Sequence, residues 1–156
     1  MAKVEACRTL EDVRVQDYAA VFIPGGHGTM WDLPGSVALA KLLSDAWQQG
    51  KAVAAVCHGP AGLLGALAED GKPLVANRRV SAFSNEEEEA VGLTGVMPFL
   101  LESRLRELGA AYESVPAFTP HAVRDGRLVT GQNPMSSDAV ARLTIEVIAE
   151  SSGTTD

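Results

Sequence analysis

Short apolar runs alternate with longer segments of helical spacing along this chain. The runs 19–23 and 52–56 are uninterrupted by polar residues, which is typical of strands buried on both faces of a sheet. Between them, apolar residues of segment 35–49 recur at the intervals of an amphipathic helix, which Gly50 would end. This alternation predicts a mostly parallel sheet with helices on both faces.

The second half of the chain continues the alternation. The expected elements are a helix over 59–68, a strand over 79–83, a helix capped by Ser84 or Asn85, a helix over 98–108, a strand over 111–115, a hairpin over 122–130 that turns at Asp125-Gly126, and a helix over 136–149. No internal repeat or low-complexity linker interrupts this order. We therefore expect one doubly wound α/β domain over residues 1–156, which opens with a polar, helix-like stretch over 5–17 rather than with a strand.

Composition limits which binding partners and which cellular compartment suit this chain. The 156 residues carry a net charge of −7, which argues against nucleic acid and membrane surfaces as partners, because both select clustered Lys and Arg. Two cysteines do not make a disulfide framework, and the first residues lack the apolar core of a signal peptide. We expect a cytoplasmic protein whose thiols stay reduced.

The strongest candidates for catalytic residues are Cys57 and His58. They follow the predicted strand 52–56 and precede Gly59, where the chain must turn sharply into the next helix. This order is typical of a nucleophile elbow, with cysteine in place of serine. We expect the elbow to pair thiol and imidazole, and the N-terminus of the following helix to favour the thiolate. A small core hydrophobe is the alternative role for Cys57.

Two other segments end strands on the edge where ligands bind in such sheets. Gly25 and Gly26 would expose backbone amides to an oxyanion, and His27 beside them would contact substrate or solvent. The run Glu86–Glu89 could supply a carboxylate that orients His58, although most of such a run is normally solvated. The histidines and cysteines show no metal-ligand spacing, so we expect no metal and no cofactor.

Taken together, these motifs resemble the ThiJ/PfpI superfamily of class I glutamine amidotransferase-like domains. The resemblance covers residues 18–149 and is most specific to the branch of heat-shock chaperones that act as glutathione-independent glyoxalase III. The matching stretches are VFIPGGHGTMWD (21–32), AVCHGPAGLL (55–64), GKPLVANRRVSAFSNEEEEAVGL (71–93), VMPFLLESRLRELGA (96–110) and DGRLVTGQNPMSS (125–137).

The resemblance implies a flavodoxin-like fold, a Cys57 nucleophile with His58 as partner, and Glu88 as the acidic member of a triad. It implies cofactor-free conversion of 2-oxoaldehydes such as methylglyoxal to hydroxy acids, and a homodimer. Glycated or unfolded proteins are further partners by resemblance, through deglycase or chaperone activity. A cysteine amidohydrolase or peptidase is a third alternative.

One departure concerns the N-terminus. Members of the superfamily carry a strand–helix–strand region that supplies a central strand and a glutamate beside the cysteine. Residues 1–18 do not match that region. We therefore expect an N-terminally truncated version of the fold, in which the proton-shuttle step lacks its usual glutamate.

Overall fold

A computed structural model describes residues 7–153 of the chain. Within these residues the main sheet has the strand order β1-β2-β6-β5, in which β1, β2 and β6 are parallel and β5 is antiparallel to β6. A second, two-stranded parallel sheet joins β3 to β4. The strands are β1 (Ala20–Ile23), β2 (Ala52–Val56), β3 (Arg79–Val80), β4 (Ala111–Tyr112), β5 (Ala122–Asp125) and β6 (Leu128–Gly131). The predicted mostly parallel sheet is confirmed.

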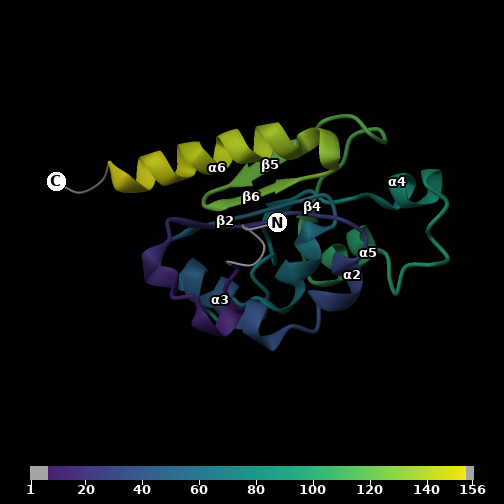
Figure 1. Ribbon diagram of the computed structural model, residues 1–156. Coiled ribbons are helices and arrows are strands. Elements are labelled where there is room, and N and C mark those ends of the chain that lie inside the picture. Colours follow the sequence, from purple (N-terminus) through teal and green to yellow (C-terminus); the bar gives the residue numbers. More distant parts are fainter. Residues whose placement is uncertain (1–6, 154–156) are drawn as a thin grey trace.

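Helices cover both faces of the main sheet. In Figure 1 the long helix α6 lies above the sheet, and α3, α2 and α5 lie below it. The α-helices are α2 (Thr29–Asp32), α3 (Val37–Gln48), α4 (Asn85–Ala90), α5 (Leu101–Glu107) and α6 (Ser137–Ser152), and the 3-10 helices are η1 (Leu10–Asp12), η2 (Val15–Asp17), η3 (Gly59–Gly65) and η4 (Pro134–Ser136). Among residues 7–153, no helix has the length and apolar character needed to span a bilayer.

Strand β2 joins the two halves of the core. Successive side chains of a strand point to opposite faces. Val53 and Ala55 accordingly enter the core on the α3 side, whereas Ala52, Ala54 and Val56 belong to the cluster on the α6 side. All five residues are buried, which explains why the strand reads as an unbroken apolar run.

Several boundaries differ from the predicted ones. The segment after Cys57 forms a 3-10 helix that ends at Gly65, not an α-helix over 59–68. Strand β3 stops at Val80, because the next amide, that of Ser81, donates to the side-chain hydroxyl of Thr130 in β6 rather than to a backbone carbonyl. Strand β4 likewise covers two residues of the five predicted, and α5 begins at Leu101 because its N-cap Leu100 is extended.

Two further corrections concern turns. Asp125 pairs with Leu128 within the hairpin, so the two-residue turn is Gly126-Arg127, with Gly126 at φ 59°. The stretch predicted as helix-like over 5–17 forms, from residue 7 onward, only the single turns η1 and η2. Its residues 5 and 6 lie outside the described part of the chain.

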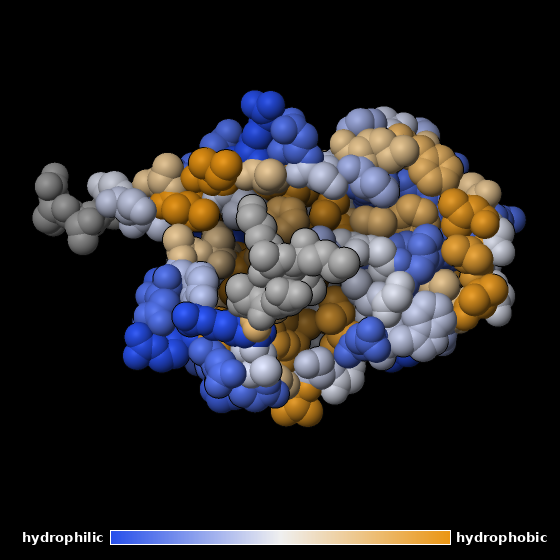
Figure 2. Space-filling model, in the orientation of Figure 1, coloured by the Kyte–Doolittle hydropathy of each residue, from blue (hydrophilic) through white to orange (hydrophobic). Residues whose placement is uncertain are grey.

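The outer edge of β1 is open within residues 7–153, because β1 has β2 as its only strand partner there. Beside this edge lies an apolar cavity of about 470 Å³, lined by Val13, Val15, Tyr18, Val21 and Phe22 among others. Figure 2 shows apolar side chains in a hollow between the layer of α6 and the layer of α3. The structure therefore presents apolar surface at a sheet edge.

The close approach of η3 to the end of β1 generates a stability prediction. A Cβ atom on Gly59 would collide with the carbonyl oxygen of Ile23, whereas one on Gly28 would meet open space. Overpacking against backbone costs about 1–3 kcal/mol. We expect Gly59→Ala to lower the free energy of unfolding by at least about 2 kcal/mol in urea denaturation, with Gly28→Ala nearly neutral. Equal stabilities of the two variants would contradict the packing described.

Candidate active site

Cys57 occupies a strained turn at the carboxyl end of β2. Its φ angle is 61°, a left-handed conformation that non-glycine residues rarely adopt. Two backbone hydrogen bonds hold it: the Cys57 amide donates to Gly131 at 2.9 Å, and the Phe83 amide donates to the Cys57 carbonyl at 3.0 Å. The side chain is 8% exposed, at the wall of a cavity. The predicted elbow is present.

The turn brings three of the predicted site residues together in a continuous series of contacts. The Cys57 sulfur lies 3.4 Å from Nδ1 of His58, and the other ring nitrogen, Nε2, lies 2.8 Å from a carboxylate oxygen of Glu88. His58 is fully buried and Glu88 is 4% exposed. Phe83 packs against the imidazole with ring centroids 4.4 Å apart. A carboxylate bonded to Nε2 keeps the proton there, so Nδ1 is free to accept the thiol proton.

The two buried members of the run Glu86–Glu89 face different partners. Ser84 caps α4 through a capping box with Glu87, as its sequence position predicts. The Glu87 carboxylate accepts hydrogen bonds from the amides of Ser84 and Phe118 and from the side chain of Asn133. Glu88 instead turns toward His58, while Glu86 and Glu89 are exposed. Glu87 therefore braces loops, and only Glu88 reaches the imidazole.

Burial determines the protonation states of Cys57 and His58. It raises the pKa of the Cys57 thiol above its ordinary value, although the amides of His58 and Gly26 hydrogen-bond the sulfur and oppose the rise. Burial also lowers the pKa of His58, although the hydrogen bond that its ring donates to Glu88 opposes this shift. At neutral pH the resting pair is therefore a thiol beside a neutral imidazole. The segment after Cys57 is a 3-10 helix, so the expected α-helix terminus that would favour the thiolate is not there.

The glycine-rich segment after β1 completes the cavity. A Cβ on Gly25 would lie 2.6 Å from the Val56 carbonyl oxygen, so only glycine lets this loop pack against the elbow. Gly26, at φ 116°, directs its amide at the sulfur. His27 lines the cavity and also bonds Glu88, with 3.0 Å between its Nε2 and Oε1 of the carboxylate. His27 is thus joined to the acid of the site, a contact that its sequence position did not predict.

The cavity above the thiol is apolar and has a volume of about 530 Å³. Sequence reasoning missed much of its wall, because these side chains come from segments with no catalytic signature. They are Phe22, Phe83, Val91, Phe118 and Met135. The only sequence signal for them was hydrophobicity, which does not distinguish a cavity wall from a core.

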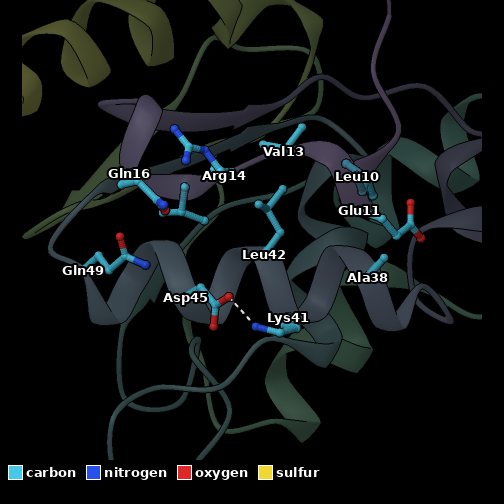
Figure 3. A pocket seen from close by; sticks show the side chains of 11 residues that line it. Leu10, Glu11, Val13, Arg14, Gln16, Ala38, Lys41, Leu42, Asp45 and Gln49 are labelled. Carbon is cyan, nitrogen blue, oxygen red and sulfur yellow. Dashed lines mark hydrogen bonds and ion pairs between the residues drawn. The ribbon is translucent and has the colours of Figure 1, made fainter.

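A third cavity, of about 280 Å³, lies between η1, η2 and α3 and contains none of the predicted site residues. Figure 3 shows that Lys41 and Asp45 on its floor turn toward each other, and they form an ion pair. Their charges are thus matched internally. We therefore place the active site at the Cys57 cavity.

Comparison with known proteins agrees with the fold and the residue pattern. The profile of the DJ-1/PfpI family matches residues 2–147. The chain belongs to the DJ-1/PfpI family. The resemblance found in the sequence is confirmed at this level.

Among curated relatives, the chain is 32% identical over 147 residues to the glutathione-independent glyoxalase HSP31 of Saccharomyces cerevisiae, covering 90% of the chain and 62% of that protein. It is 33% identical to glyoxalase 3 of Candida albicans, covering 81% of the chain and 56% of the relative. The solved structure of glyoxalase III from Candida albicans superposes with a TM-score of 0.83 at 30% identity, over 88% of this chain and 60% of that one.

A Francisella tularensis protein, Rapid Encystment Protein 24 KDa, superposes with a TM-score of 0.87 at 35% identity, over 90% of this chain and 63% of that one. The chain thus spans about 60% of the length of these relatives.

The protonation state generates a prediction about thiol reactivity. Because burial raises the pKa of Cys57, alkylation by iodoacetamide should accelerate from pH 7 to at least about 9, beyond the ordinary cysteine pKa of about 8.5. Glu88→Gln should slow alkylation at pH 7.5 by at least about tenfold, because the imidazolium formed as His58 takes the proton loses its counter-charge. Rates are measured by mass spectrometry of the Cys57 peptide.

The exposed Glu86→Gln serves as the matched control and should alkylate at the wild-type rate. A rate that is already maximal at pH 6 would instead reveal a resting thiolate and contradict the assignment.

Proposed function

We propose that this chain is a cofactor-independent, cysteine-dependent enzyme that converts small 2-oxoaldehydes such as methylglyoxal to 2-hydroxy acids. The single observation that carries the proposal is the Cys57–His58–Glu88 arrangement at the base of an apolar cavity. Relatives at about 30% identity are named glutathione-independent glyoxalases, which supports the same chemistry. The proposal includes a reducing, cytoplasmic compartment, since the reaction needs Cys57 as a thiol.

The first step forms a bond between sulfur and the aldehyde carbon. His58 takes the thiol proton on Nδ1, which lies 3.4 Å from the sulfur, and the resulting imidazolium is stabilised by Glu88. The aldehyde oxygen becomes an oxyanion in this hemithioacetal. The amides of Gly26 and His58, which already point at the sulfur, are placed to stabilise that charge.

The second step moves the hydrogen of the former aldehyde carbon to the neighbouring carbonyl carbon. Removal of the proton gives an enediol, and its return to the adjacent carbon leaves a thioester of the 2-hydroxy acid. Water then hydrolyses the thioester, which releases the acid and restores the thiol. No external oxidant is consumed, because one carbon is oxidised as its neighbour is reduced.

The transfer between carbons needs a base beside the substrate. Within residues 7–153, His58 has its Nδ1 3.4 Å from the Cys57 sulfur. We therefore propose that His58 can also take up and return the proton in this step.

Lactate formation from methylglyoxal tests the proposal. The wild-type chain should form lactate without glutathione or metal, and Cys57→Ala should lose all measurable activity, because no other thiol of residues 7–153 lines the cavity. Cys7→Ala is the matched thiol control and should keep the wild-type rate. Enzymatic assay of lactate measures all three proteins. Equal rates for wild type and Cys57→Ala would refute the proposal.

A stress-protective chaperone is the second candidate, favoured by the outer edge of β1, with which no other strand of residues 7–153 pairs. Tyr18 and Phe22 beside this edge are 43% and 40% exposed. An unpaired strand edge flanked by apolar side chains is suited to bind extended segments of unfolded or glycated proteins. This activity would not use the thiol.

A lysine at the edge separates the two functions, because lysine blocks strand addition. If the edge binds unfolded proteins, Tyr18→Lys should lose suppression of thermal aggregation of a client enzyme, as followed by light scattering. Cys57→Ala should suppress aggregation as well as wild type. A wild-type chain without any suppression, or an unaffected Tyr18→Lys, would exclude the chaperone.

A further inference from the structure

Glu88 is shared by two imidazoles. Its Oε2 lies 2.8 Å from Nε2 of His58, and its Oε1 lies 3.0 Å from Nε2 of His27. The two rings are in contact in a tilted arrangement, with centroids 4.1 Å apart and planes inclined at 43°. The triad explains the first contact, since His58 needs an orienting carboxylate. It does not explain why a second imidazole is held against the same carboxylate.

The three side chains have the composition of a transition-metal site. One donor atom from each of His27, His58 and Glu88 lies within 4.8 Å of the other two. Two histidines and one carboxylate form a common set of protein ligands for zinc and iron. Mg²⁺ and Ca²⁺ prefer sets made of oxygen alone, so these imidazoles select against them.

Two of the three donor–donor separations are close to those of a metal site, and the third, between the two imidazoles, is no more than 4.8 Å. Zinc–nitrogen and zinc–oxygen bonds of about 2.0–2.2 Å in a tetrahedral site put neighbouring donor atoms about 3.3 Å apart. The N···O separations of 2.8 and 3.0 Å would open by only a few tenths of an ångström. A metal ion would take the place of the two hydrogen-bonded protons, which would move to Nδ1 of each ring.

An entry path is present. The side chain of His27 is 36% exposed and lines the cavity above Cys57, whereas those of His58 and Glu88 are almost fully enclosed. An ion in the cavity would therefore meet His27 first, and water from the cavity would fill the fourth position. We propose that His27, His58 and Glu88 form a binding site for a divalent transition metal such as Zn²⁺.

A metal ion bound at this site would prevent His58 from activating the Cys57 thiol. With Nε2 of His58 bound to metal, its proton lies on Nδ1, which faces the Cys57 sulfur. That nitrogen then donates a hydrogen bond to sulfur and no longer accepts the thiol proton. The bound metal is therefore an inhibitor, which makes it a regulatory ligand rather than a cofactor.

Sequence spacing predicted no metal site, and the reason is visible in the fold. His27 and Glu88 are separated by 61 positions, and His58 and Glu88 by 30. Local motifs of the H-x-x-x-H kind cannot register such a set. The three residues meet because the loop after β1, the elbow after β2 and helix α4 converge at one edge of the sheet.

Zinc binding to a chain without thiols tests the site independently of the proposed enzymatic activity. In the Cys7→Ala/Cys57→Ala double variant, isothermal titration with Zn²⁺ should show one site per chain. Adding His27→Ala should weaken binding by at least about 100-fold, since loss of even an outer partner costs about 10- to 100-fold. Adding His121→Ala, which removes a histidine outside the cluster, should leave affinity unchanged.

Co²⁺ gives a second readout that does not depend on affinity. In the double variant it should produce the visible d–d bands of a four-coordinate site, and Glu88→Gln should abolish or shift them while circular dichroism shows an intact fold. The proposal is overturned if the double variant binds no Zn²⁺ in the micromolar range. It is equally overturned if His27→Ala binds as tightly as its parent.

Discussion

The site depends on the tight packing of the turn after β2 between the ends of β1 and β6. Cys57 keeps a left-handed backbone because its amide is bound to Gly131 and its carbonyl to the Phe83 amide. Gly25 fits against the same turn without room for a side chain. This clamp lets two adjacent residues, which on a regular strand would point apart, bring sulfur and imidazole within 3.4 Å. The strain at Cys57 is thus held by its neighbours, as is common where geometry serves chemistry.

Burial then decides how the pair works. Burial favours the neutral forms of both the Cys57 thiol and the His58 imidazole. The proton therefore stays on sulfur until the thiol attacks a substrate. Two buried carboxylates follow each other in α4 and have separate tasks. Glu87 binds the loops that carry Phe118 and Asn133, and Glu88 holds the imidazole.

Much of this arrangement could be predicted from the sequence, because it is local. The unbroken apolar run of β2, the elbow residues after it and the Ser84 cap each occupy a few consecutive positions. The bond between His27 and Glu88 could not be predicted, since it depends on how the loop after β1 and helix α4 meet in the folded chain. The 3-10 character of η3 was also missed, because its small residues are compatible with either helix, and packing against β1 decides between them. The choice of Glu88 within its acidic run came from family resemblance, and its contact with His58 is a tertiary one.

The proposed chemistry requires that His58 rests as a neutral imidazole with its proton on Nε2, held by Glu88, and a bare Nδ1 toward Cys57. Nitrogen-15 NMR of the labelled chain at neutral pH measures this directly, because protonated and bare ring nitrogens have well-separated chemical shifts. We expect one protonated nitrogen, Nε2, and one bare nitrogen, Nδ1, for His58. Two protonated nitrogens would show an imidazolium paired with a resting thiolate and would contradict it.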